Sequence, residues 1–390
     1  MSEYQIRTIF AAFAFVYSII ASRLERTPIN GALVYVGAGM LLGPQALGLV
    51  DLDVDGEAVS RLAEFALAIC LFTDSSNANL SILRRIESAP IRLLLIGLPL
   101  TIALGLGLGV IIFDNLGFFE IALIATMLAP TDAALGKAVV TNPAVPEKVR
   151  ESLNVESGLN DGICVPVILF FIAVAAGSVE ASDSAGLVLK LPLEVIGIGV
   201  LVGLLLAAVG GLALRFCAAR GWVAGTWLQI PIVALAFMCF GLAQWLGGSG
   251  FIACFVGGLT FGGLTKTHKE QFLESAEGAG DALALLTWFT FGTIAIGLLF
   301  NYFSWQAVIY AVLSLTIVRM LPVYLSLAGK RLQIDTLLFI GWFGPRGLAS
   351  IVFAVMVAAQ QLPGNNTILA TVAWTCLLYT SDAADERVRV

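Results

Sequence analysis

Charged residues are what this sequence has least of. Lys, Arg, Asp and Glu together make up 12% of the 390 residues, against roughly 25% in soluble domains, whereas 59% are hydrophobic. The few basic residues form no stripe with interleaved aromatics, which excludes a nucleic-acid-binding surface. The composition predicts a polytopic membrane protein whose surroundings are membrane lipid.

Side chains that hold metals or cofactors are also scarce. The chain has one histidine, His268, and six cysteines without paired spacing, which argues against a disulfide framework and a Cys/His metal centre. It shows no glycine-rich phosphate loop and no nucleophile with an adjacent base. We therefore expect no cofactor and no enzymatic activity.

Apolar runs long enough to cross a bilayer, about 20 residues each, recur along the whole chain. They fall at 4–22, 27–43, 57–74, 91–113, 117–138, 147–176, 188–216, 227–246, 249–265, 281–300, 304–327, 337–360 and 367–380. The connecting loops leave no room for a separate soluble domain. The sequence thus predicts about thirteen transmembrane helices in one integral membrane domain, residues 1–380.

The distribution of basic residues gives the orientation of these spans. Arginine and lysine gather in the loops that follow odd-numbered spans, whereas the loops after even-numbered spans hold only Lys190. The loop after the second span carries four acids instead, within 51–57. Because basic loops stay in the cytoplasm, we expect the N-terminus outside and the C-terminus inside the cell.

Proline and glycine interrupt two of the predicted spans. Pro130, Thr131 and Asp132 break the run 117–138, and the sequence Gly-Pro-Arg-Gly at 344–347 breaks the run 337–360. The two runs are an odd number of spans apart and therefore have opposite topology. Paired broken helices in inverted halves are typical of the substrate site of a secondary transporter. Asp132 and Arg346 would supply the charges that the freed helix ends require.

A third polar segment, Glu-Ser-Gly-Leu-Asn-Asp-Gly at 156–162, lies inside the apolar run 147–176. An ionisable residue at bilayer depth is costly and indicates function. Ser157 and Asp161 share one helix face, and Glu156 and Asn160 share the neighbouring face. Such hard oxygen ligands suit an alkali cation better than a transition metal. One carboxylate, Asp161, would then bind either the cation or a proton.

Structural roles compete with these functional ones. Asp74 is followed by Ser75, Ser76 and Asn77 and could simply face water at a helix end. The same alternative is weaker for Asp132 and Asp161, which apolar residues flank. For the remaining ionisable residues at depth, the alternative is a buried ion pair that holds the bundle together, and we expect one such pair among Glu156, Arg319 and Arg346.

Five motifs together resemble the NhaP-type sodium/proton antiporters, a group that includes the eukaryotic sodium/proton exchangers. The motifs run nearly end to end: Leu71-Phe-Thr-Asp74, Ala129-Pro-Thr-Asp132-Ala-Ala, Glu156-Ser-Gly-Leu-Asn160-Asp161-Gly, Val318-Arg319-Met-Leu-Pro and Gly344-Pro-Arg346-Gly. The Asn-Asp pair separates this branch from relatives with two acids. Ala133 departs from the pattern, because many relatives have proline after Thr-Asp.

The resemblance implies an all-helical antiporter fold of inverted repeats, with two crossed broken helices. A core domain, spans 4–6 and 11–13, would move as an elevator against a scaffold that forms a homodimer in the cell inner (plasma) membrane. By the same resemblance Asp161 is the alternating carboxylate, and Asp132, Ser157, the main-chain carbonyl of Thr131 and, through water, Asp74 complete the cation shell. Glu156 would pair with Arg319 and orient Asn160, and Arg346 would compensate charge at the crossing.

The expected activity is electroneutral exchange of Na⁺ or Li⁺ for a proton, which regulates intracellular pH and sodium. Potassium or mixed-cation exchange on the same scaffold is the main alternative, since ligand identity does not separate the two. A channel-like sensor would show acid rings or carbonyl filters, which the sequence lacks. An organic-anion symporter is the third alternative, but Asp132 and Asp161 would repel its substrate.

The end of the chain is anomalous. The apolar part of the run 367–380 covers about 14 residues, short of the roughly 20 needed to cross a bilayer. The polar tail 381–390 is interpreted as a non-native artefact joined to a truncated reading frame. The alternative is a short, tilted last helix with a polar cytoplasmic end.

Overall fold

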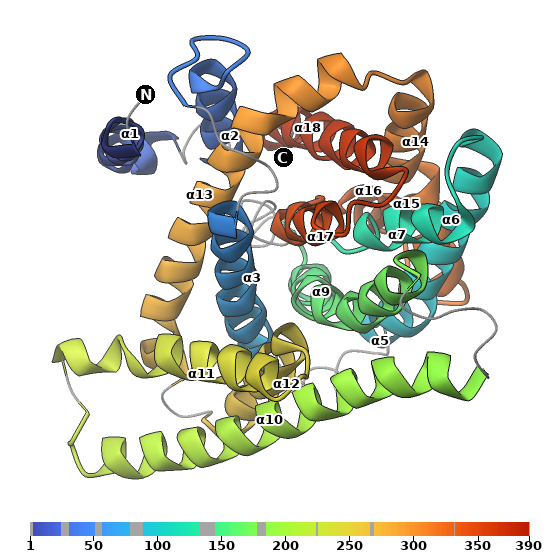
Figure 1. Ribbon diagram of the computed structural model, residues 1–390. Helices are drawn as coiled ribbons and strands as arrows, with labels where there is room; N and C mark the ends of the chain where they lie inside the picture. The colour runs from blue at the N-terminus through green and yellow to red at the C-terminus, as the bar shows by residue number, and fades with distance from the viewer. Residues whose placement is uncertain are drawn as a thin grey trace.

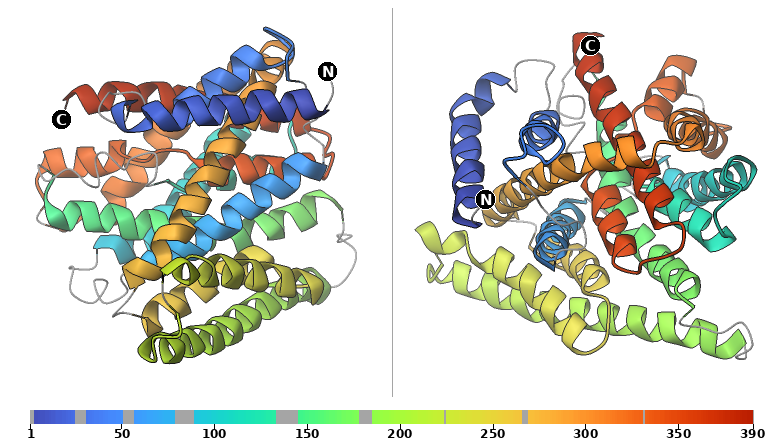
Figure 2. Two further views of the ribbon diagram at one scale, coloured as in Figure 1. Left: turned by 90° about the vertical axis from the view of Figure 1, so that its left-hand side faces the viewer. Right: turned by 45° about the horizontal axis from the view of Figure 1, so that its top comes forward.

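The computed structural model describes residues 3–24, 31–50, 57–78, 89–132, 145–177, 185–223, 225–265, 269–330 and 332–389. Every regular element within these ranges is helical, as predicted. The helices lie side by side in one bundle (Figure 1), and α1 begins at the opposite end of the bundle from the end of α18 (Figure 2, left). Ala133, His268 and the acids at 51–56 fall outside the described residues.

Each predicted run corresponds to one helix or one broken helix, where the structure describes it. The helices are α1 Glu3–Leu24, α2 Gly31–Leu42, α3 Glu57–Asn77, α5 Ala89–Arg92, η1 Leu93–Gly97, α6 Leu98–Ile112, α7 Phe118–Met127, α9 Glu147–Ala175, α10 Ala185–Ala219, η2 Gly225–Leu228, α11 Pro231–Trp245, α12 Gly250–Leu264, α13 Lys269–Asn301, α14 Trp305–Leu315, α15 Ile317–Ser326, α16 Ile334–Trp342, α17 Leu348–Ala358 and α18 Asn365–Arg389. By length and apolar composition alone, five described segments are long enough to cross a membrane: 89–112, 147–175, 193–219, 272–301 and 305–326. The count of thirteen spans stays a prediction.

Two helices differ from the predicted runs. α13 begins at Lys269 rather than at residue 281, because its first turns carry polar residues such as the exposed Glu274, which continue the helix beyond its apolar part. The run 304–327 is broken at Thr316, where φ is −108° and ψ is −91°. Thr316 Oγ1 donates to Val312 O at 2.7 Å, a local bond that competes with regular helix geometry.

α18 continues as one helix through residue 389 and takes in the polar segment after residue 380. The interpretation of that segment as non-native is untested by this helix and stays a prediction.

The helices pack in two groups that meet along α3. α2 packs on α13, α10 on α11 and α12, and α3 on both α12 and α13. In the second group α7 packs on α6 and α9, and α18 packs on α14 and α17. α3 also contacts α9 and α17, so it lies where the two groups meet (Figure 2, right). Asp74, near the end of α3, is thereby placed at this boundary.

Glycines bring α3 and α12 into close contact. A side chain on Gly258 would overlap the Phe72 carbonyl oxygen and the Ser75 hydroxyl, and one on Gly262 would overlap the Ser76 carbonyl oxygen. Two of these three groups are backbone atoms, which have little freedom to move aside. Small residues at such crossings let helix backbones approach closely in lipid.

We expect Gly258→Ala to lower the stability of the protein by about 1–3 kcal/mol, because the added methyl group overpacks this crossing. Gly263→Ala is the matched control, since a Cβ there meets nothing within 4 Å. Thermal unfolding in detergent measures the difference. Equal midpoints for the two variants would show that α3 and α12 separate without cost.

Candidate functional site

The two broken helices cross in the structure. α7 ends at Met127 and the chain continues without helix to Asp132, while residues 343–347 separate α16 from α17. The non-helical segments touch, because the Asp132 amide donates to the Pro345 carbonyl at 2.8 Å. The interruptions predicted from proline and glycine thus meet at one point inside the bundle.

At each break, a charged side chain bonds to the free backbone groups of the other broken helix. Asp132 Oδ2 accepts from the Leu348 amide at 3.0 Å, at the N-terminus of α17. Arg346 Nη1 donates to the Ala129 and Pro130 carbonyls, both at 3.0 Å, just beyond the C-terminus of α7. A carboxylate at a helix N-terminus and a cation at a C-terminus both oppose the partial charges of the helix ends. Asp132 and Arg346 therefore hold the crossing together reciprocally.

Two further residues, Gly347 and Ser350, make contacts at the crossing that the sequence analysis did not predict. A side chain on Gly347 would overlap the Asp132 carboxylate, so glycine is needed for this close approach. Ser350 Oγ donates to the Met127 carbonyl at 2.8 Å and satisfies one more free end of α7. In the sequence, Ser350 is a polar residue inside an apolar run, one turn after Arg346, and this position could have predicted its contact with α7.

The polar segment of α9 lies against the non-helical segment that follows α7. Ser157 Oγ donates to the Thr131 carbonyl at 2.6 Å, and Asn160 Nδ2 donates to Thr131 Oγ1 at 2.7 Å. All three residues are buried. Both Glu156 carboxylate oxygens are bonded to Arg319, and the amide of Asn160 is bonded to Thr131, so the orientation of Asn160 by Glu156 stays a prediction.

Glu156 and Arg319 form a buried, bidentate ion pair. Arg319 Nη1 and Nη2 donate to Glu156 Oε1 and Oε2 at 2.5 and 3.0 Å, and the two residues are only 4% and 3% exposed. The planar fork of arginine matches a carboxylate in this way. Gly344 lies against the same guanidinium, since a side chain there would crowd Arg319 Nε. The pair thus joins α9, α15 and the break before α17.

Asp161 differs from Asp132 and Glu156, whose carboxylate oxygens accept hydrogen bonds at the site. Its Oδ1 is buried and has no hydrogen-bond partner in the described part of the chain. Asp132 and Asp74 both interact with it electrostatically. A buried carboxylate oxygen without a partner is costly unless a proton or a cation satisfies it. This atom is therefore where a ligand would be expected to bind.

Asp74 approaches the same place from α3. Its main chain lies against α9, because a Cβ on Gly158 would meet the Asp74 carbonyl oxygen at 3.2 Å. Its side chain is exposed, although it interacts electrostatically with Asp132. The structure therefore places Asp74 beside the site, with its carboxylate on an open face.

The site as a whole carries excess negative charge. Glu156 and Arg319 neutralise each other, whereas the carboxylates of Asp74, Asp132 and Asp161 interact with one another. A pocket lined by one sign of charge raises the local concentration of counter-ions. The arrangement favours a cation and disfavours an organic anion.

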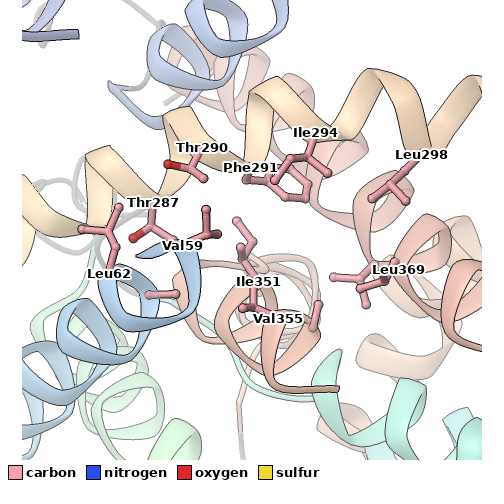
Figure 3. A pocket seen from close by; sticks show the side chains of 13 residues that line it. Val59, Leu62, Thr287, Thr290, Phe291, Ile294, Leu298, Ile351, Val355 and Leu369 are labelled. Carbon is pink, nitrogen blue, oxygen red and sulfur yellow. The ribbon is translucent and has the colours of Figure 1, made fainter. Parts of the chain in front are cut away.

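An apolar cavity of about 40 Å³ lies elsewhere, between α3 and α13 on one side and α17 and α18 on the other (Figure 3). Its only polar side chains, Thr287 and Thr290, donate their hydroxyl protons to carbonyls of their own helix. Figure 3 shows aliphatic side chains such as Val59, Ile351 and Leu369 around it. This cavity offers no ligand set for an ion and is not part of the site.

Comparison with known proteins agrees with this geometry. The family model described as "Sodium/hydrogen exchanger, transmembrane" matches residues 10–381. The chain belongs to the sodium/hydrogen exchanger family. It is therefore a multi-pass membrane protein of a cation/proton antiporter family, as the motifs indicate.

Curated relatives of this family carry different cation names. The K(+)/H(+) antiporter NhaP2 of Shewanella sp. (strain MR-4) is 26% identical over 371 residues, which cover 93% of this chain and 62% of that protein. The Na(+)/H(+) antiporter of Schizosaccharomyces pombe is 27% identical over 273 residues, 66% of this chain and 58% of that protein. The chain thus spans about three-fifths of the length of these relatives.

A solved structure shares the fold along the entire chain. The sodium proton antiporter MjNhaP1 from Methanocaldococcus jannaschii superposes with a TM-score of 0.81 at 21% identity. The match covers 99% of this chain and all of the other. The predicted architecture, with inverted repeats and crossed broken helices, is confirmed at the level of the fold.

We expect Glu156→Gln and Arg319→Ala each to cost about 3–5 kcal/mol of stability, because each strands a buried charge. The double variant should lose less than the two single losses combined. A double-mutant cycle on thermal unfolding in detergent measures the coupling. Strictly additive losses would contradict an energetic role for this contact.

Proposed function

We propose that the protein is a secondary transporter that exchanges a monovalent cation, Na⁺ or Li⁺, for a proton without any cofactor. The observation that carries the proposal is the buried, unbonded Oδ1 of Asp161 within a site of excess negative charge. Family membership supports the reaction type. The cation would be the substrate, held by Asp161 together with Asp132, Ser157, the Thr131 carbonyl and Asp74.

Exchange follows from competition for one carboxylate. Protonated Asp161 has no negative charge to hold a cation, and ionised Asp161 needs one, so the two ligands exclude each other. Thr131 supplies a carbonyl oxygen and Ser157 a hydroxyl oxygen, and Asn160 holds Thr131 in place from the neighbouring face of α9. The reciprocal caps at Asp132 and Arg346 keep this ligand set together while the protein moves.

Alternating access would come from movement of one helix group against the other. The core would contain α5 to α9 and α14 to α18, and the scaffold would contain α1 to α3 and α10 to α13. The two packing groups that meet along α3 support this division. We further infer a homodimer in the inner membrane, with the N-terminus outside and the C-terminus in the cytoplasm. The opposite positions of the two chain ends are in keeping with that orientation.

Potassium is the second candidate for the transported cation. Several curated relatives are named K(+)/H(+) antiporters, and oxygen ligands of this kind accept either ion. Everted vesicles that contain the protein, tested with Na⁺, Li⁺ and K⁺ in turn, separate the two. If K⁺ dissipates the pH gradient and Na⁺ and Li⁺ do not, the transported cation is potassium and not sodium.

Asp161→Asn should abolish cation-dependent proton movement, because the amide neither ionises nor takes up a proton at physiological pH. Asp335→Asn is the matched control, since Asp335 is an exposed acid in the first turn of α16. The measurement is dissipation of the pH gradient in vesicles at equal protein levels. Full exchange by inserted Asp161→Asn protein would refute the mechanism.

Exchange should be electroneutral, with one cation moved per proton. Position 160 is an asparagine, whose side chain holds Thr131 and carries no charge, and Glu156 is neutralised by Arg319. Asp132 is bonded at the start of α17 and Asp74 lies beside the site, so the charge that we expect to be exchanged is that of Asp161. Proteoliposomes with the membrane voltage clamped at different values test this, and a rate that changes with voltage would contradict it.

A further inference from the structure

We propose that the end of α10 binds the headgroup of an anionic phospholipid through Arg220. The site is an exposed cluster formed by Arg220, Phe216 and Trp222, here called the α10 cluster. It lies where α10 meets the loop to α11, at the left-hand edge of Figure 1, away from the helix crossing. It takes no part in the exchange mechanism proposed above.

Two aromatic rings hold the Arg220 guanidinium in place. Its carbon lies 3.7 Å from the centroid of the Phe216 ring and 5.4 Å from that of the Trp222 ring. The two rings are nearly perpendicular, at 89°. Stacking on ring faces is favourable for a guanidinium and leaves its N–H groups free at the edge. Within the described residues, none of these N–H groups has a hydrogen-bond partner.

The backbone fixes the position of Trp222 relative to Arg220. Gly221 has φ of +69°, the left-handed conformation that ends many helices. The Trp222 amide donates to the Cys217 carbonyl at 2.9 Å, and the Gly221 amide donates to the Ala218 carbonyl at 2.9 Å. These are the two bonds of a Schellman helix end. The turn folds the indole back over the last turn of α10, so the cluster is preformed.

The cluster lies at the depth of lipid phosphates. Residues 195–214 of α10 carry no charge and are about as long as the hydrocarbon core is thick. Arg220 follows Arg215 by five residues, or about 7 Å along a helix, which is the scale of the headgroup layer. Trp222 and Trp227 are 65% and 68% exposed, as tryptophans at a membrane interface are.

Charge favours an anion here. No Asp or Glu occurs from 195 to 269, whereas this stretch holds Arg215, Arg220, Lys266 and Lys269. Arg215 Nη1 already donates to the Leu264 carbonyl at the end of α12, so it adds charge while Arg220 keeps its donors. A guanidinium edge matches a phosphate in bidentate fashion. The exposed rings would contact the glycerol and acyl part, which favours a lipid over free phosphate.

The test is native mass spectrometry of the full chain, released from a neutral detergent with added phosphatidylglycerol or phosphatidylcholine. The wild type should retain phosphatidylglycerol in preference to phosphatidylcholine, and Arg220→Gln should lower that occupancy several-fold. Arg23→Gln is the matched control: it removes the same charge from an exposed arginine in the last turn of α1, for which the described residues supply no ring partner, and should leave occupancy unchanged.

Arg220→Lys keeps the charge but loses the planar fork, so it should show an intermediate occupancy. Thermal midpoints without added lipid show that the variants fold. Wild-type occupancy in both Arg220 variants would overturn the proposal, as would equal retention of phosphatidylcholine. Full displacement of the lipid by inorganic phosphate would assign the cluster to free phosphate. A changed dimer fraction with unchanged lipid occupancy would assign it to a second copy of the chain.

Discussion

The site depends on the cost of ending helices inside a membrane. A helix broken at bilayer depth exposes amide and carbonyl groups that no water reaches, and each must find a partner. Here the partners come from the other broken helix: Asp132 accepts at the start of α17, and Arg346 donates past the end of α7. Neither break is stable without the other, so the crossing forms as one unit and carries Thr131 and Asp132 with it.

Around this crossing, a few buried polar atoms have no partner among the described residues, and the one that belongs to a carboxylate is Asp161 Oδ1. Arg319 occupies both oxygens of Glu156, and Thr131 is held by Ser157 and Asn160. Asp161, one residue beyond Asn160, keeps a buried oxygen without a protein partner. Asn160 and Asp161 are adjacent but have different roles. Asn160 holds the segment that contains Thr131, whereas Asp161 has an oxygen that is open to a ligand.

The positions of the helices and of the polar site could be predicted from the sequence, because a polar residue at bilayer depth has few possible roles. Apolar runs located the helices, and Pro130 and Pro345 located the breaks. The rule that buried charges are paired predicted one ion pair among Glu156, Arg319 and Arg346, and the family resemblance implied that Arg319 is the partner of Glu156. The sequence does not predict which of several nearby groups becomes the hydrogen-bond partner of a polar side chain. The bond from Asn160 to Thr131 is one such choice, because it depends on how α9 is rotated against the crossing.

Exposed surfaces were the least predictable part, for a physical reason. The apolar pattern predicts the structure of a residue only where that residue is buried or faces lipid. Beyond the ends of the spans, the pattern gives no such prediction. The first turns of α13 continue as helix before the predicted run for this reason, with Glu274 exposed. At the end of α10, Arg220 looks in sequence like any basic residue of a loop. Only the turn at Gly221, which folds Trp222 back, shows that this guanidinium lies against two aromatic rings.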